Sequence, residues 1–449
     1  MLTGSGAPDP GRLFAGIDFN SFPRVIAAIS GGSDSTALLV LLDAYLRSAF
    51  PGALLVAATV DHGLREGSAA EARQVARLCA DLGIRHVTLR WAGDKPSTGL
   101  PAAARAARYR LLAEAAEAEG ARIIVTGHTA DDQAETVLMR QARGAGRGLA
   151  GMAPAALHDG RIWIVRPLLD VRRDALRDVL RGRGIDWIDD PTNENSDFER
   201  VRLRARLTEP GIFEDAISSA RAAAVVRKRE GVRAAELIRA YGDCPAPGLI
   251  RLAPDFAQGV ERDAAIYALR ILLAVAGGRT YLPDAARSAA LFERLAQPPS
   301  RATLSGAIAA VRPDGIYLLR EARGLPAAGP ARSGQNWDGR YRLEGEANAM
   351  DIAPLGPTTA ARLASDIPAA PRALVRAALS VEPALWRDGR ALGPLPADAA
   401  GGLRARRILA PWAGLLPCFD LAPARAVASL LGAEAPSDPP YAGHSDAAA

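Results

Sequence analysis

The chain has 449 residues, enough for about three domains of ordinary size. Its hydrophobic content of 49% supports buried cores, and its net charge of +5 with a pI near 9.3 suits a polyanionic partner such as RNA. Because no run of about 18 apolar residues occurs, we expect no membrane-spanning helix.

The cysteine pattern and the first residues indicate the compartment. Cys79, Cys244 and Cys418 are far apart and form no C-x-x-C pair, which argues against a zinc ribbon or an iron–sulfur site. Scattered cysteines of this kind are typical of reduced, cytosolic proteins. Residues 1–22 lack a basic start followed by an apolar core, so they predict a disordered leader rather than a signal peptide. We expect a cytoplasmic protein.

The first predicted strand, residues 25–29, leads into a Gly/Ser turn and then into a helix that continues through Leu46. Two glycines let the backbone approach a ligand closely, and the N–H groups at a helix start favour a phosphate. No Gly-Lys-Ser/Thr occurs, so this is not a Walker loop. An ordinary turn is the alternative interpretation. The predicted phosphate-binding residues are Ser30, Gly31, Gly32, Ser33, Asp34, Ser35 and Thr36.

Strands and helices alternate through the next 150 residues or so. The pattern predicts strands at 54–60, 86–91, 123–125 and 162–165, with helices at 71–83 and 102–120. Such alternation predicts an α/β domain over residues 23–208, with a parallel sheet covered by helices on both faces. Ligands of these sheets bind beyond the carboxyl ends of the strands, where Asp61, His62, Gly127 and His128 lie.

An acidic segment follows the strand at 123–125 and begins a helix. It carries Asp131, Asp132 and Glu135, of which Asp131 and Glu135 share a face at i,i+4. Clustered carboxylates of this kind can hold Mg²⁺ against phosphates. The alternative is that they only complement the helix dipole.

The rest of the chain predicts smaller modules. Residues 212–323 predict a helical or α+β substrate-binding domain, with helices at 213–242, 262–276 and 284–295 and a turn at 312–315 between two strands. After a Gly/Pro/Ala linker, residues 336–433 predict a small β-containing module with turns at 337–340 and 386–390. Residues 434–449 predict a disordered tail.

Together, the two motifs closely resemble one family. The S-G-G-x-D-S turn resembles the pyrophosphate loop of the N-type ATP pyrophosphatases, and with the acidic segment it resembles the tRNA(Ile)-lysidine synthases. Further matching segments follow in chain order, with one departure: Val201 stands where the family usually carries Asn. The resemblance is strong over residues 24–207, and its further segments are 60–65, 103–109, 144–152, 166–169, 187–193 and 198–204.

The resemblance implies an adenine-nucleotide α-hydrolase-like catalytic domain that uses ATP and Mg²⁺. It implies ligation of free L-lysine to C2 of the wobble cytidine in an isoleucine tRNA with a CAU anticodon, through an adenylated cytidine. Asp34 and one of Asp131 or Asp132 would bind Mg²⁺ or orient the triphosphate. Glu135 or the remaining aspartate would bind the lysine amine and accept its proton.

Several arginines are candidates for contact with tRNA or phosphate, with solvated surface charge as the alternative. They are Arg105, Arg108, Arg200, Arg202 and Arg204. The sequence does not decide the oligomeric state, and a homodimer is one option.

Two other functions stay open. A tRNA thiolase of the same fold would need cysteines to carry sulfur or a cluster, and the spacing here argues against that. A non-catalytic RNA-binding relative is the second, which the intact Ser/Gly/Asp motifs argue against.

Overall fold

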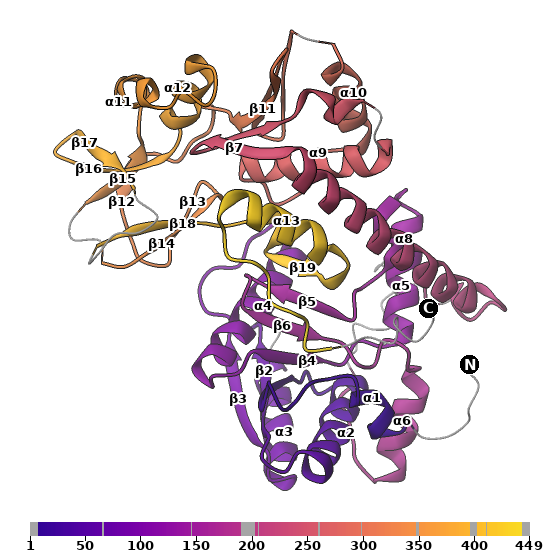
Figure 1. Cartoon of the computed structure of the whole chain (residues 1–449). Helices are drawn as coiled ribbons and strands as arrows, with labels where there is room; N and C mark the ends of the chain where they lie inside the picture. The colour runs from indigo at the N-terminus through magenta and orange to yellow at the C-terminus, as the bar shows by residue number, and fades with distance from the viewer. Residues whose placement is uncertain are drawn as a thin grey trace. The chain divides into compact units, whose positions relative to one another are not determined.

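The computed structural model describes residues 8–64, 67–144, 146–189, 203–204, 206–258, 261–297, 299–346, 350–395, 402–409 and 411–441. The chain divides into two units, Met1–Arg227 with Ser437–Ala449 and Lys228–Pro436. Figure 1 shows the course of the chain through both.

The first unit is built on a mostly parallel sheet. The strands β1 (Arg24–Ala28), β2 (Leu54–Asp61), β3 (Arg85–Arg90), β4 (Ile123–Thr126) and β6 (Ile162–Val165) pair in parallel, and β5 (Ala155–His158) runs antiparallel to β6. Within this unit the order is β5-β6-β4-β1-β2-β3. The predicted α/β fold is therefore confirmed. β5 was not predicted, because Ala155-Ala156-Leu157-His158 has no β-branched residue.

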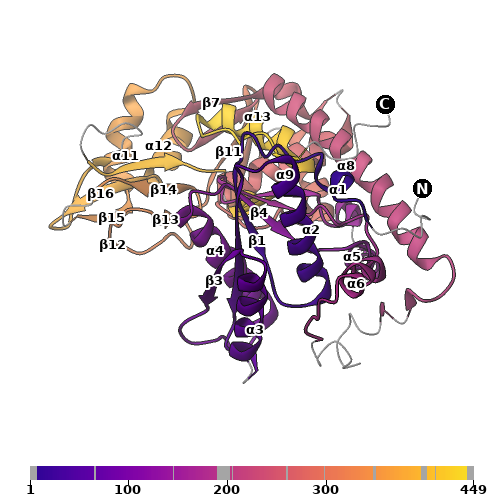
Figure 2. The ribbon, with the colours of Figure 1, turned by 90° about the horizontal axis from the view of Figure 1, so that it is seen from below.

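Helices cover this sheet. They are α2 (Ser33–Ala49), α3 (Ser68–Asp81), α4 (Leu100–Ala118), α5 (Ala130–Gln141) and α6 (Arg173–Gly182). Figure 2 shows α4 and α2 on opposite sides of β1. β1 pairs with β4 and β2 along its edges and has a helix on each face, so its apolar residues are covered and Ile26 is fully buried. The turns that leave the carboxyl ends of β1 and β4 thus follow buried strands at the centre of the sheet.

The prediction of disordered ends is wrong for the described parts of both. Residues 10–14 form helix α1 (Pro10–Phe14), and Phe14 and Phe19 are buried against Tyr45, with ring centroids 5.5 and 6.1 Å away. Ile17 forms a β-bridge with Tyr441. The few apolar residues of each end pack on the sheet domain, which their polar composition concealed.

The first part of the second unit contains the predicted helices and hairpin. The helices are α8 (Ile212–Tyr241), which runs across the boundary at residue 227, α9 (Arg262–Gly277) and α10 (Ala285–Leu295). The sheet has the order β7-β8-β11-β10-β9, formed by β7 (Gly242–Ala246), β8 (Leu249–Leu252), β9 (Ser300–Leu304), β10 (Ala307–Arg312) and β11 (Gly315–Arg320). β10 and β11 pair across the predicted turn, Arg312 opposite Gly315.

Residues after 328 add two small sheets and three helices. One sheet has β12 (Gly329–Pro330), β15 (Asp351–Pro354), β16 (Pro383–Arg387) and β17 (Arg390–Pro394). The other has β13 (Asn336–Trp337), β14 (Tyr341–Glu344) and β18 (Arg404–Arg407). The two predicted turns join β13 to β14 and β16 to β17. The remaining elements are α11 (Pro357–Leu363), α12 (Arg372–Ser380), β19 (Leu415–Pro417) and α13 (Leu421–Leu431).

The two modules predicted at 212–323 and 336–433 are not separate in the structure. Tyr317 and Leu319 of β11 share an apolar cluster with Leu355 and Val375. A buried ionic network crosses the same boundary: Arg320 donates to Asp338, which also accepts from Arg340, whose Nη1 lies 2.5 Å from Glu382 Oε1. No helix in the described ranges is long and apolar enough to cross a membrane.

Candidate active site

The turn after β1 is held by its own hydroxyl groups. Ser35 Oγ donates to the carbonyl of Gly32 (3.1 Å) and accepts from the amide of Ser30 (3.2 Å). Thr36 Oγ1 donates to the carbonyl of Gly31 (3.3 Å). Gly32 is the N-cap of α2, and no side chain of the described residues caps the helix start. These hydroxyls therefore shape the loop, and the helix start supplies the favourable field for an anion.

Two glycines allow close approach around this turn. Gly31 has φ of +89°, and a Cβ there would lie 2.6 Å from Ile188 Cδ1. The amide of Ile188 donates to the carbonyl of Gly31 (2.9 Å), which brings the predicted segment 187–193 against the loop as far as residue 189. A Cβ on Gly127 would lie 3.0 Å from the carbonyl carbon and oxygen of Asp34. The backbone that follows β4 thus lies directly against the start of α2.

The acidic segment forms the first turns of α5, and part of its role is capping. Thr129 and Asp132 make a reciprocal capping box, with the Thr129 amide 2.9 Å from Asp132 Oδ2. Asp131 Oδ2 accepts from the backbone amide of Arg173 at 2.8 Å, and Asp131 Oδ1 lies 3.3 Å from Arg172 Nε. Asp131 therefore holds the start of α6.

Arg173 joins the remaining carboxylates. Its Nε donates to Asp34 Oδ2 at 2.8 Å and its Nη2 to Asp132 Oδ1 at 3.1 Å, while Nη1 lies 4.0 Å from Glu135 Oε1. Asp131, which the i,i+4 spacing puts on the same face as Glu135, contacts the start of α6 instead of this guanidinium. Residues three apart on a helix are also neighbours, and Asp132 and Glu135 converge on the guanidinium.

Glu135 is 1% exposed. Its Oε1 accepts from Arg204 Nε at 2.7 Å, and its Oε2 is buried without a hydrogen-bond partner among the described residues. Burial raises the pKa of Glu135, and the hydrogen bond from Arg204 opposes the shift. Burial likewise raises the pKa of Asp34 against the effect of Arg173.

The predicted Mg²⁺ ligands do not fit a ready metal site in this arrangement. Asp34 and Asp132 each give an oxygen to Arg173, and Asp131 is turned toward the backbone of α6. Within the described part of the chain, no three His, Cys, Asp or Glu residues are grouped to hold a metal ion.

The predicted histidines lie beside the arginines of α4. Burial, then the charge of Arg166, lowers the pKa of His128 to about 3, and its Nδ1 lies 2.9 Å from Thr126 Oγ1. Burial, then Arg108, lowers the pKa of His62, whose Nδ1 is buried without a partner in the described ranges. Both rings are thus neutral near pH 7.

Asp61 serves its own turn. A hydrogen bond from Ser68, followed by that from the Gly63 amide to Oδ1 (2.9 Å), lowers the pKa of Asp61. These hydrogen bonds give Asp61 a structural role in holding the turn after β2. Its predicted contact with the nucleotide stays a prediction.

The predicted tRNA arginines fall into three groups. Arg105 and Arg108 are exposed on α4. Arg204 lies against Glu135. Arg200 and Arg202 are outside the described residues. Arg166, 4% exposed, was not predicted as a site residue: its Nη1 donates to the carbonyl of Ala153 at 2.8 Å, and its Nε has no partner among the described residues.

Arg173 was also missed. It follows the matched segment 166–169 by only a few residues, and three clustered carboxylates require a nearby cation. That requirement was a usable signal.

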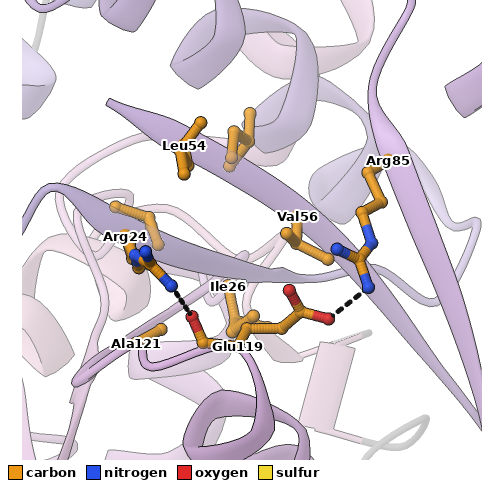
Figure 3. A pocket seen from close by; sticks show the side chains of 9 residues that line it. Arg24, Ile26, Leu54, Val56, Arg85, Glu119 and Ala121 are labelled. Carbon is orange, nitrogen blue, oxygen red and sulfur yellow. Dashed lines mark hydrogen bonds and ion pairs between the residues drawn. The ribbon is translucent and has the colours of Figure 1, made fainter. Parts of the chain in front are cut away.

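A cavity of about 210 Å³ lies at the opposite, amino-terminal ends of the strands. Figure 3 shows Glu119 between the two arginines that line it. Arg24 Nη1 donates to the Glu119 carbonyl (2.9 Å) and Arg85 Nη2 to its Oε1 (2.7 Å). Because it lies at the ends of the strands away from the phosphate-binding turn, this cavity is separate from the site.

A turn that favours phosphate joins a parallel strand to a helix, and carboxylates at the end of the adjacent strand face it. This arrangement defines a nucleotide-binding domain of the PP-loop class. Residues 12–210 match the family model described as a PP-loop domain.

Relatives extend this likeness to the whole chain. It is 55% identical to the tRNA(Ile)-lysidine synthase of Mesorhizobium japonicum, with 97% of each chain covered. Identity to that of Rhizobium meliloti is 44%, covering 74% of this chain and 75% of the relative. Identity to that of Brucella suis is 38%, covering 94% and 98%. The chain belongs to the tRNA(Ile)-lysidine synthases.

Proposed function

We propose that this chain ligates L-lysine to C2 of the wobble cytidine of a CAU-anticodon isoleucine tRNA, with consumption of ATP. The observation that carries the proposal is the likeness of 55% over 97% of both chains to a tRNA(Ile)-lysidine synthase. The geometry agrees, because a phosphate-binding turn and a carboxylate cluster meet at one end of the sheet. We place the protein in the cytoplasm, where its substrates are.

The reaction needs two displacements. Cytidine O2 attacks the α-phosphorus of ATP and pyrophosphate leaves. The ε-amine of lysine then attacks C2, AMP leaves with O2, and the amine loses a proton. The loop at residues 30–36 and the start of α2 would stabilise the pyrophosphate, so this half of catalysis is positioning and charge stabilisation.

Glu135 is our candidate for the amine. Its Oε2 is buried and without a partner among the described residues, while Oε1 is held by Arg204. A lysine ammonium has an unperturbed pKa of about 10.4, so attack at neutral pH requires a group that takes its proton. The raised pKa of Glu135 suits an acceptor of that kind.

The neutral rings of His62 and His128 line the same end of the sheet and would contact the nucleotide without adding charge. Arg105 and Arg108 would contact tRNA phosphates from α4. We assign Mg²⁺ to the incoming triphosphate, because the carboxylates are engaged with Arg173.

Sulfur transfer is the competing chemistry on this fold, and it needs a reactive thiolate. Burial raises the pKa of Cys79, the cysteine of the first unit, to about 11. Desolvation of its sulfur raises the pKa of Cys244 to about 11, although the residue as a whole is exposed. Neither thiol is activated.

The test is incorporation of labelled lysine. We expect ATP-dependent label in a CAU-anticodon isoleucine tRNA and none in an isoleucine tRNA with a GAU anticodon. Asp34→Ala should remove the incorporation, and the protein should still unfold cooperatively, because Arg173 keeps its ion pair with Asp132. No ATP-dependent label in the CAU tRNA would refute the proposal.

A further inference from the structure

The Arg173 side chain connects three segments of the candidate site. Arg173 is the first residue of α6, and it bonds Asp34 at the start of α2 and Asp132 at the start of α5. Its backbone amide is fixed by Asp131 on the same helix as Asp132. Two residues of α5 therefore hold Arg173, because Asp131 bonds its backbone amide and Asp132 bonds its guanidinium.

The charges around it explain why a cation is needed there. The side chains of Asp34, Asp132 and Glu135 are 17%, 19% and 1% exposed. The Arg173 side chain is 18% exposed, so the charges of this cluster face little water. Without the guanidinium that they share, the three carboxylates would repel one another when all are ionised.

The guanidinium also occupies the oxygens that a divalent ion would require. A metal such as Mg²⁺ binds carboxylate oxygens at about 2.0–2.1 Å. Asp34 Oδ2 and Asp132 Oδ1 instead lie 2.8 and 3.1 Å from nitrogens of Arg173. One cluster cannot hold both cations on the same oxygens, so the two compete.

We propose that Arg173 is the resident counter-ion of this cluster: it positions Asp34 against Asp132 and excludes a free divalent ion until a triphosphate arrives. This inference rests on the proposed function, since ATP is the ligand that ends the exclusion. A triphosphate offers the guanidinium phosphate oxygens in place of Asp34 and brings its own metal. Arg173 is thus a positioning residue, and the carboxylates are presented to Mg²⁺–ATP as an already ordered set.

The experiment titrates the full chain with Mn²⁺ in the absence of ATP, tRNA and lysine. Electron paramagnetic resonance measures the bound Mn²⁺. We expect the wild-type protein to bind Mn²⁺ at this cluster at least about tenfold more weakly than Arg173→Gln, because a unit positive charge at contact distance is removed. Asp132→Asn in the Arg173→Gln background should abolish the gained site.

Two further variants separate charge from geometry. Arg110→Gln is the matched control, since it removes an arginine paired to a carboxylate (Glu114, 2.7 Å) on the surface of α4, and it should gain no Mn²⁺ site. Arg173→Lys keeps the charge and should still exclude Mn²⁺. It should nevertheless slow pyrophosphate release, because one ammonium cannot reproduce the two-pronged contact with Asp34 and Asp132.

The outcomes are distinct. Wild-type protein that binds Mn²⁺ as tightly as Arg173→Gln would overturn the inference, as would a folded Arg173→Gln protein that gains no site. If Arg173→Gln does not fold, tight Mn²⁺ binding by folded Arg173→Lys would overturn it. The Mn²⁺ titration contains no substrate, so its result does not depend on the reaction. A failure to form lysidine in the separate labelling assay would refute the proposed function and leave the Mn²⁺ result unchanged.

Discussion

Gly127→Ala tests the contact between the end of β4 and the phosphate-binding turn. The new Cβ would lie 3.0 Å from three backbone atoms, namely the carbonyl carbon and oxygen of Asp34 and the Cα of Ser35. Backbone cannot rotate away as a side chain can, so the start of α2 must shift by a few tenths of an ångström. Overpacking of this kind costs about 1–3 kcal/mol of unfolding free energy.

The shift should harm nucleotide binding more than the fold, because Asp34 and Ser35 belong to the turn itself. Loss of one hydrogen bond from the loop to a charged phosphate is worth about 1.5–3 kcal/mol, so we expect KM for ATP to rise about 10- to 100-fold in pyrophosphate release. Gly52→Ala is the matched control, because a Cβ there meets nothing within 4 Å. If Gly127→Ala resembles Gly52→Ala in both urea unfolding and KM, the close approach has no functional role.

Four other predictions address the reaction, the second unit, pH and salt. Glu135→Gln should permit adenylation of the tRNA but raise the lysine requirement in single-turnover assays; loss of both steps would make the carboxylates a single functional cluster. Glu382→Gln should cost about 3–5 kcal/mol in urea unfolding because it leaves the buried Arg340 unbalanced, whereas Asp243→Asn, in a partly exposed pair, should cost about 1 kcal/mol or less; equal costs would contradict the buried network. Because the pKa of His128 is lowered from 6.5 to about 3, the unfolded chain binds its proton first and stability falls as pH drops below 6.5; His128→Asn should reduce that slope by up to about 1.4 kcal/mol per pH unit, and an unchanged slope would exclude this histidine as its source. Affinity for tRNA, measured by filter binding, should fall steeply with salt as counter-ions are released, and a flat dependence would exclude phosphate contacts.

Local patterns sufficed for the central strands of the sheet domain and for its two motif loops, but not for β5 and α6. The strand at 25–29, the glycines of the turn and the acid-rich helix start lie close together in sequence, and their geometry follows from residue type and spacing. β1 and α2 therefore begin and end within a few residues of the prediction.

Contacts between distant segments could not be predicted this way. Arg173 is 139 residues from Asp34 along the chain, and no periodicity links them. Likewise, one core joins β11 to Val375, although a Gly/Pro-rich linker between them suggested a domain boundary. In the first case a charge needs a partner from another segment, and in the second an apolar surface is buried only by another segment. Neither need specifies its partner in the local sequence.

The same contacts change how the second unit should be tested. Deleting residues 336–449 would remove Asp338 and Glu382 from a buried network and would also remove Tyr441, which is buried in the first unit. Point substitutions are therefore the appropriate way to separate tRNA affinity from ATP binding.

The central claim is that one site adenylates the tRNA and then exchanges AMP for lysine. The most direct measurement incubates the protein with CAU-anticodon isoleucine tRNA and ATP labelled at the α-phosphate, first without lysine. We predict that label becomes attached to the tRNA with release of pyrophosphate, and that added lysine then releases it as AMP while lysidine forms at the wobble position. Lysidine formation without prior transfer of the label to tRNA, or label that lysine does not release, would contradict the account.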